Sequence, residues 1–303
     1  MDAIEDIDSP GAPPTLAQLA VLQAVAEAGS FSAAARRLGR AQSVISYTVA
    51  MLERQLGLAL FARGGTRPVL TSAGQAVLAD ARLVAQAMQV LQARAAGLRG
   101  GLEAEVGLAV EVMFPTERLV RALHDFAQHF PTVALRLSVA ALGGVVERVL
   151  QRDCVLGVSG WTASLFDALE RRQLGHVALV PVAAPSHPLA ALPGPITRAA
   201  LAEHVQLVLS DPSALTRGQS FGVLSPRVWR LGDLGAKHAL LRAGLGWGNM
   251  PVHLVAADLA TGGLVALTLS DQGALELPML LIHRADTPPG AAGQWLAQRL
   301  TEE

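Results

Sequence analysis

The feature that most constrains this chain is residues 30–71, where two short amphipathic helical segments meet at a tight turn and a hairpin follows. The first segment begins at Ser30, which can cap a helix, and ends at Gly39, while the second covers about Gln42 to Leu56. Turn residues at positions 64, 65 and 68, flanked by apolar pairs, predict a short wing. This order predicts a winged helix-turn-helix, whose second helix is the kind that enters the major groove of duplex DNA.

Another helix is predicted before this motif. Thr15 and Gln18 have the spacing of a capping box, and Gly29 is placed to end the helix. Between them an apolar stripe recurs at helical spacing, formed by Leu16, Leu19, Leu22, Val25 and Ala26.

The second helix of the motif has one polar face. Its inward residues are predicted to be Val44, Ile45, Val49, Leu52 and Leu56. The residues that this leaves on the outer face are Gln42, Ser43, Ser46 and Tyr47. A glutamine can bond adenine through both its oxygen and its nitrogen, and a tyrosine can contact a phosphate or a thymine methyl. The four residues are therefore candidate DNA contacts, and the alternative is a solvated helix surface.

Basic residues are concentrated around the same motif. Residues 15–100 contain nine basic and three acidic side chains, whereas the rest of the chain is acidic. Arg36, Arg63 and Arg67 flank the second helix and the wing, so they are candidate phosphate contacts. The alternative is that they are ordinary solvent-exposed charges.

Residues 15 to 75 resemble the winged helix-turn-helix of LysR-type transcriptional regulators. The matching residues are Ser30-Phe31, Ala33-Ala34-Ala35, Leu38, Gln42-Ser43, Ser46, Leu52-Glu53, Leu56-Gly57, Leu60-Phe61, Arg63, Leu70-Thr71 and Ala73-Gly74. The chain departs from the family at Tyr47, Thr48, Ala50 and Met51, where members often carry basic or amide residues. The resemblance therefore implies DNA binding, with more of the phosphate contact coming from Arg36, Arg37, Arg63 and Arg67.

A long helix is predicted over residues 72–100. Its apolar residues recur in two series of seven that are offset by three, at Val77, Ala81, Val84, Met88, Leu91, Ala95 and Leu98. A seam of this length predicts pairing with a second copy, and the alternative is one amphipathic helix packed on its own domain. The resemblance also implies a dimer or tetramer. Two reading helices would then require an inverted-repeat DNA site.

From residue 102 onward, short apolar strands alternate with helices, which predicts an α/β domain with parallel strands. The expected strands are residues 106–112, 133–139, 155–159, 177–182, 205–209, 264–267 and 279–283. The expected helices include residues 117–130, 144–152 and 234–243. The resemblance implies a domain like a periplasmic binding protein that binds a small-molecule effector in a cleft. Its first lobe would be residues 102–163 and 268–303, and its second lobe residues 164–267.

Ligands of open α/β sheets lie beyond the carboxyl ends of the strands, which defines the candidate effector site. The candidates at such ends are Met113, Phe114, Thr116, Ser159, Trp161, Ser210 and Trp247. The loops at residues 141–144 and 247–250 belong to the same set. The apolar and aromatic members suggest an effector with an apolar part, and Thr116 and Ser159 could hold a carboxylate. The alternative is ordinary packing.

Other functions are less well supported. The sequence lacks the usual metalloprotease, P-loop and serine-hydrolase motifs, and Gly244-Leu-Gly-Trp-Gly248 misses the dinucleotide-binding spacing, so no enzyme is expected. A solute-binding protein would suit the second domain but would need an export signal. Cys154 is the only cysteine, which excludes a disulfide within the chain. No metal or cofactor is expected.

The expected organisation follows from these features. Residues 1–14 are acidic and proline-containing and are predicted to form a disordered tail, with no secretory signal and hence a cytoplasmic location. The predicted winged helix-turn-helix covers residues 15–74, the linker and dimerisation helix residues 72–100, and the effector-binding α/β domain residues 102–303. No apolar run reaches the roughly 20 residues that cross a bilayer.

Overall fold

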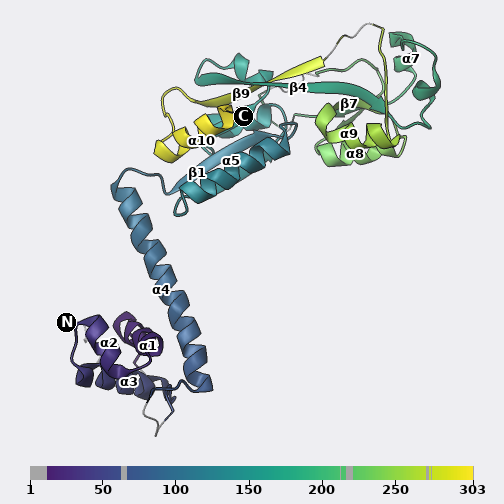
Figure 1. Cartoon of the computed structure of the whole chain (residues 1–303). Coiled ribbons are helices and arrows are strands. Elements are labelled where there is room, and N and C mark those ends of the chain that lie inside the picture. The colour runs from purple at the N-terminus through teal and green to yellow at the C-terminus, as the bar shows by residue number, and fades with distance from the viewer. Residues whose placement is uncertain are drawn as a thin grey trace. The chain divides into compact units, whose positions relative to one another are not determined.

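The computed structural model describes residues 12–62, 67–211, 213–215, 221–270, 273 and 275–302. The chain divides into two compact units, Met1–Ala96 and Gly97–Glu303 (Figure 1). Of the acidic tail expected at residues 1–14, only residues 12–14 are described, and they form neither helix nor strand.

The first unit is built from helices, which confirms the predicted elements. Its members are α1 (Leu16–Ala28), α2 (Phe31–Leu38), α3 (Gln42–Leu56) and α4 (Ser72–Arg99). Thr15 and Gln18 form the predicted capping box at the start of α1. Gly29, Gly39 and Gly57 end the first three helices with φ values of 65°, 62° and 67°, a left-handed conformation that favours glycine.

The wing begins and ends where the sequence predicts. Phe61 and Leu70 form an antiparallel bridge, and the Ala62 N–H donates to the Val69 carbonyl at 2.8 Å. Arg63 and the Gly64-Gly65 turn lie outside the described residues.

One buried core joins the helices of the first unit. Leu22, Ile45 and Leu52 are fully buried in it, and Leu60 brings the base of the wing into the same cluster. The prediction that Val44 packs inward is wrong, because its side chain is 43% exposed. Ile45 fills the core at that turn of α3, and Val44 lies one position away on the solvent side.

The predicted seam of α4 changes character along the helix. Val77 packs against the core of the first unit and Ala81 is buried. Farther along, Val84, Leu91 and Leu98 are 40%, 59% and 47% exposed. The start of the seam therefore completes the fold of its own unit, whereas the later apolar positions face solvent in a single chain.

The second unit is an α/β domain, as predicted. Its strands are β1 (Glu105–Glu111), β2 (Ala134–Ala140), β3 (Leu156–Ser159), β4 (Leu169–Ala183), β5 (Gln206–Leu209), β6 (Val228–Leu231), β7 (Trp247–Pro251), β8 (Val265–Ala266) and β9 (Leu275–Arg284). Its helices are α5 (Thr116–His129), α6 (Gly143–Leu150), α7 (Arg198–Ala202), α8 (Leu234–Arg242), α9 (Val252–Thr261) and α10 (Ala291–Thr301), with 3₁₀ turns at Trp161–Leu165 and Pro188–Ala191.

The strands of this unit form one hydrogen-bonded sheet in the described residues. Its order is β2-β1-β3-β9-β4-β7-β5-β6, and β8 pairs with β4. The pairs β1–β2, β1–β3, β5–β6 and β5–β7 are parallel, as predicted, but β9 and β4 are antiparallel to their neighbours. The sheet is therefore mixed rather than parallel throughout.

Two long strands join the halves of the sheet. β4 and β9 pair from Leu169 with Arg284 to Leu179 with Leu275, interrupted by an irregularity at Gly175 (Figure 1). The predicted strands at residues 177–182 and 279–283 cover only the apolar ends of β4 and β9, because β4 starts with the exposed residues 170–173. An exposed charged stretch does not have the apolar run or alternation that marks a strand.

Candidate functional site

The outer face of α3 is a candidate DNA-reading surface in the first unit. Gln42, Ser43, Ser46 and Tyr47 are all exposed there. None of their side chains forms a hydrogen bond to another described residue, and Ile45 and Val49 hold the opposite face in the core. The face therefore leaves its polar groups available to a partner.

Glu53 ties this helix to the wing. Its Oε1 accepts hydrogen bonds from the backbone N–H of Leu60 at 2.7 Å and of Phe61 at 3.1 Å. At the other side of the wing, Gly74 lies so close to Leu60 that a Cβ at this position would meet the Leu60 carbonyl. Glu53 and Gly74, both part of the sequence motif, therefore fix the base of the wing against α3 and α4.

The candidate phosphate-binding arginines differ in their surroundings. Arg36 and Arg67 are exposed. Arg37, next to Arg36 on α2, donates from Nη1 to Glu27 at 2.6 Å, so part of its charge is neutralised within the unit. Arg63 lies outside the described residues.

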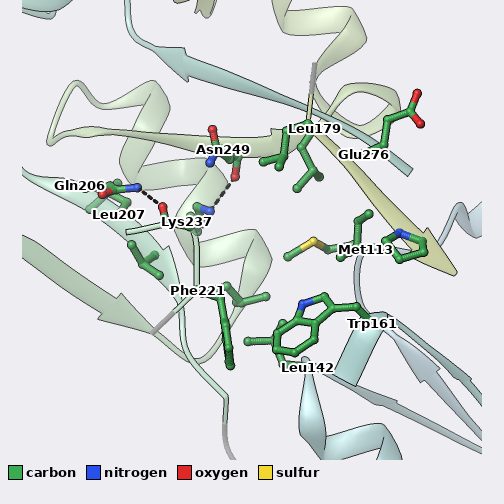
Figure 2. A pocket seen from close by; sticks show the side chains of 16 residues that line it. Met113, Leu142, Trp161, Leu179, Gln206, Leu207, Phe221, Lys237, Asn249 and Glu276 are labelled. Atoms are coloured by element: carbon green, nitrogen blue, oxygen red, sulfur yellow. Dashed lines mark hydrogen bonds between the residues drawn. The ribbon is translucent and has the colours of Figure 1, made fainter. Parts of the chain in front are cut away.

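The second unit contains a cavity of about 360 Å³ with mainly apolar walls (Figure 2). Met113 and Trp161 line one side, and the Trp161 ring meets Phe221 edge to face, with ring centroids 4.5 Å apart. The apolar walls are completed by Leu142, Leu179, Leu207, Leu209, Leu275, Leu277 and Pro278. A cavity of this size and character is at the small end of the range typical of small-molecule sites.

Lys237 is the buried cation of this cavity. It lies on α8, is 4% exposed, and donates from Nζ to the backbone carbonyl of Asn249 at 2.6 Å (Figure 2). Burial lowers the pKa of its amine to about 8. Gly248 gives the side chain room, because a Cβ there would lie 3.3 Å from Lys237 Cε.

The other polar groups of the cavity are arranged differently. Gln206 is satisfied by the chain, because it donates to Gly222 and accepts from the N–H groups of Leu224 and Ser225. Asn249 Oδ1 is buried and has no hydrogen-bond partner in the part of the chain that the structure describes. Glu276 is exposed, and its carboxylate points away from Lys237 in Figure 2.

Two carboxylates lie at the amino end of α6, beside the cavity. Glu111, 1% exposed at the end of β1, accepts from the Leu142 N–H at 2.8 Å. Asp211 accepts from the N–H groups of Gly143 at 2.9 Å and Ser213 at 2.8 Å. Burial, with a smaller contribution from the charge of Asp211, raises the pKa of Glu111 to about 8.

The local backbone is adapted to this arrangement. Leu142 has a φ of 51°, which side-chain-bearing residues rarely adopt. At the next position, a Cβ on Gly143 would collide with the Asp211 side chain. The turn before α6 is therefore shaped around carboxylates that the chain itself supplies.

Of the effector residues suggested by the sequence, the structure brings Met113 and Trp161 together in the cavity, with Leu142 and Asn249 from the two predicted loops. The five other single candidates do not line it. Phe114 is buried beneath the Arg118 guanidinium, and Thr116 is exposed at the start of α5. The buried Ser159 hydroxyl lies 3.4 Å from that of Thr162, and the Ser210 hydroxyl donates to Leu231.

Trp247 has a packing role. It is fully buried in a separate apolar cluster with Leu189, Leu201 and Leu267. An inward-facing position on β7 accounts for this placement, because alternate residues of a strand point to opposite faces.

Sequence reasoning missed Lys237, Gln206 and Phe221. Lys237 is the only lysine of the chain, whereas arginine supplies the other basic positions. A single lysine among arginines could have marked Lys237 as a candidate functional residue, although this residue lies inside a helix rather than at a strand end. Gln206 and Phe221 carried no such signal.

A winged helix-turn-helix followed by an α/β domain with an apolar cavity defines a DNA-binding regulator with a ligand-binding domain. The family models agree: residues 16–75 match the bacterial regulatory helix-turn-helix protein model of the lysR family, and residues 99–303 match the LysR substrate binding domain. The chain belongs to the LysR family of transcriptional regulators, which are DNA-binding proteins rather than enzymes.

Individual relatives support this assignment. The chain is 29% identical to the probable HTH-type transcriptional regulator YhaJ of Escherichia coli over 290 residues, covering 94% of this chain and 95% of YhaJ. It is 31% identical to the E. coli regulator PunR over 255 residues, covering 84% and 82%. Its fold is similar to that of a Corynebacterium glutamicum OxyR C206 mutant, with a TM-score of 0.54, 22% identity and coverage of 96% and 93%.

Among the described residues, no helix combines the length and the apolar character that a bilayer span requires.

Proposed function

We propose that the protein acts in the cytoplasm as a homo-oligomer, binds an inverted-repeat promoter site through paired α3 helices, and changes its DNA binding when a small molecule occupies the cavity. The observation that carries this proposal is the exposed face of α3, where Gln42, Ser43, Ser46 and Tyr47 have no partner among the described residues. Polar side chains on a helix held beside a wing are suited to base edges and phosphates.

The proposed dimer forms along α4. Val84, Leu91 and Leu98 are apolar and exposed, and burying them against a second α4 would remove them from water. An apolar groove of about 210 Å³ between α1 and α4, lined by Leu16, Leu19, Ala81 and Met88 among others, adjoins the same positions. A homodimer is the smallest assembly that this surface supports, and a homotetramer would need a second interface.

The proposed effector site is the cavity that contains Lys237. With lobe one taken as residues 102–163 and 268–303 and lobe two as residues 164–267, its walls come from both lobes. Met113 and Trp161 belong to the first, and Leu207 and Lys237 to the second. A ligand that contacts both lobes can favour one arrangement of them, which is the condition for a switch.

The proposal is tested by footprinting the purified protein on the DNA upstream of its own gene. Protection of two half-sites, related by a twofold axis and separated by about one helical turn or a multiple, is the expected result. Protection of a single half-site, or none on any promoter fragment from a genomic library, would refute it.

Gln42→Ala and Ser46→Arg are expected to change which DNA sequence is preferred. A lost or altered base contact costs about 1–3 kcal/mol at the affected base pair. Affinity selection from random DNA followed by sequencing measures the preference. Gln298→Ala, at an exposed glutamine of α10, is the matched control and should leave the preference unchanged. Unaltered preferences in both α3 variants would show that this face does not read bases.

Arg63→Ala and Arg67→Ala are expected to weaken binding to all DNA sequences alike. Each removes about one phosphate contact, so the slope of log affinity against log salt should become shallower by about one. Fluorescence anisotropy from 50 to 300 mM salt measures this slope. Arg172→Ala, an exposed arginine of β4, removes the same charge outside the first unit and should not alter it. Equal slopes for all three variants would contradict the assigned roles.

A further inference from the structure

The cavity contains an ammonium group for which the described residues supply no counter-charge. In the described part of the chain, no carboxylate lies within ion-pair distance of Lys237 Nζ, and the amine makes a single hydrogen bond, to the Asn249 carbonyl. An ammonium has three N–H donors, so two remain for another partner. Burying a cation without a counter-charge is costly, and the cost falls when an anion enters the same cavity.

The residue that holds Lys237 carries a second polar atom. The Asn249 side chain belongs to the cavity lining, and its Oδ1 is buried without a partner among the described residues, whereas its backbone carbonyl accepts from Lys237. Buried polar atoms of native proteins are usually paired, so an unpaired one in a cavity wall is an indication of a missing ligand group. Asn249 Oδ1 can accept a hydrogen bond from a ligand N–H or O–H group.

The other place in the cavity wall that would suit an anion is already filled. The N–H groups of Leu142 and Gly143, at the amino end of α6, bond to the carboxyl group of Glu111 and the carboxylate of Asp211. The charge of Asp211 would also repel a second anion at that end of the cavity. An anionic effector is therefore directed to Lys237.

The remaining residues of the cavity wall indicate which kind of ligand skeleton fits. Trp161, Phe221 and Met113 present aromatic and thioether surface, and Leu207 and Leu277 add aliphatic surface. A cavity of about 360 Å³ accommodates one or two rings. Flat apolar surface of this kind is suited to an aromatic ring, which can stack edge to face with Trp161 or Phe221.

We propose that the effector is an aromatic or similarly flat apolar compound with one anionic oxygen group, such as an aromatic carboxylate, and that Lys237 binds this group. This inference rests on the proposed effector role of the cavity. It assigns Lys237 as the residue that distinguishes an acid from a neutral or cationic compound of the same shape.

The test uses three probes of one shape: 2-naphthoate, its neutral amide 2-naphthamide, and 2-naphthylmethylammonium. Isothermal titration calorimetry on the full chain measures their affinities. For the wild type, 2-naphthoate is expected to bind at least ten-fold more tightly than the amide, and the ammonium least tightly. In Lys237→Met, which keeps an unbranched side chain of similar length, the acid and the amide should bind equally.

Two controls separate the possible failures. Arg172→Ala removes an exposed cation and should keep the preference for the acid. Thermal unfolding shows whether Lys237→Met is folded. If the variant is unfolded, the preference of the wild type for the acid over the amide still tests the inference. Equal binding of acid and amide by the wild type, tighter binding of the ammonium, a folded Lys237→Met that retains the preference, or binding of none of the probes at millimolar concentration would overturn the inference. DNA footprinting with the same preparations tests the proposed regulator separately, since protection of an inverted repeat would stand whichever probe binds.

Discussion

Leu91→Arg is expected to convert the protein to a monomer and to lower its affinity for a full inverted-repeat site by about 100-fold or more. Leu91 is 59% exposed near the middle of the apolar series on α4. A charge at this position would be buried against its own copy across a twofold axis, at a cost that no partner offsets. Loss of the dimer also removes the gain in affinity from binding two linked half-sites, which reaches 10²- to 10⁴-fold.

Analytical ultracentrifugation and anisotropy on full-site and half-site DNA measure the two effects. Gln86→Arg is the matched control, because residue 86 is an exposed position on the side of α4 opposite the seam. It adds the same charge and should leave both the sedimentation coefficient and the affinity near those of the wild type. A Leu91→Arg protein that sediments as the wild type does would refute pairing through α4.

Glu111→Gln is expected to stabilise the second unit at neutral pH and to flatten its pH dependence. In the unfolded chain Glu111 loses its proton near the ordinary pKa of 4.5, whereas the folded chain keeps it until about pH 8. Between these values ionisation favours the unfolded state. The contribution of Glu111 to the free energy of unfolding therefore falls by about 1.4 kcal/mol for each pH unit, and what it contributes below pH 4.5 is lost by pH 8.

Glutamine cannot ionise, and its amide oxygen can still accept from the Leu142 N–H. The variant should therefore match the wild type near pH 4.5 and exceed its stability increasingly up to pH 8. Lys237, whose pKa is lowered to about 8, titrates between there and 10.5, so its contribution rises only above this interval.

Urea unfolding followed by tryptophan fluorescence measures this stability. All four tryptophans, at positions 161, 229, 247 and 295, belong to the second unit, so the full chain can be used. Glu170→Gln, at an exposed glutamate of β4, is the control and should follow the wild type. A wild-type protein whose stability does not fall relative to Glu111→Gln between pH 5 and 8 would contradict the assigned proton on Glu111.

The helices of the first unit could be predicted from the sequence because their ends are marked locally. Thr15 with Gln18 begins α1, and Gly29, Gly39 and Gly57 end three helices in the left-handed conformation. Each signal acts within one or two helical turns, so it does not depend on the rest of the fold. Val44 was assigned wrongly because periodicity alone does not determine which of two adjacent apolar residues faces the core.

The second unit was less predictable because its site is assembled from distant segments. β9 and β4 lie side by side although about 100 residues separate them along the chain. Their antiparallel pairing is formed only when the end of the chain returns to the sheet. The rule that ligands lie beyond strand ends led to Met113 and Trp161. It could not lead to Lys237, which reaches the cavity from within α8, because the burial of a helical residue depends on what packs over it.

In α3, the residues that hold the fold are different from the residues proposed to read DNA. Glu53, which bonds to the wing, belongs to the first group. The fold of the unit depends on Glu53 and on the inward residues of α3, whereas the four outer side chains form no hydrogen bond or ion pair with the other described residues. Substitutions at those four positions should thus leave the melting temperature of the unit almost unchanged. Descendants of such a gene could acquire new operators without first acquiring compensating stabilising mutations, which makes this scaffold easy to retarget by evolution or by an engineer.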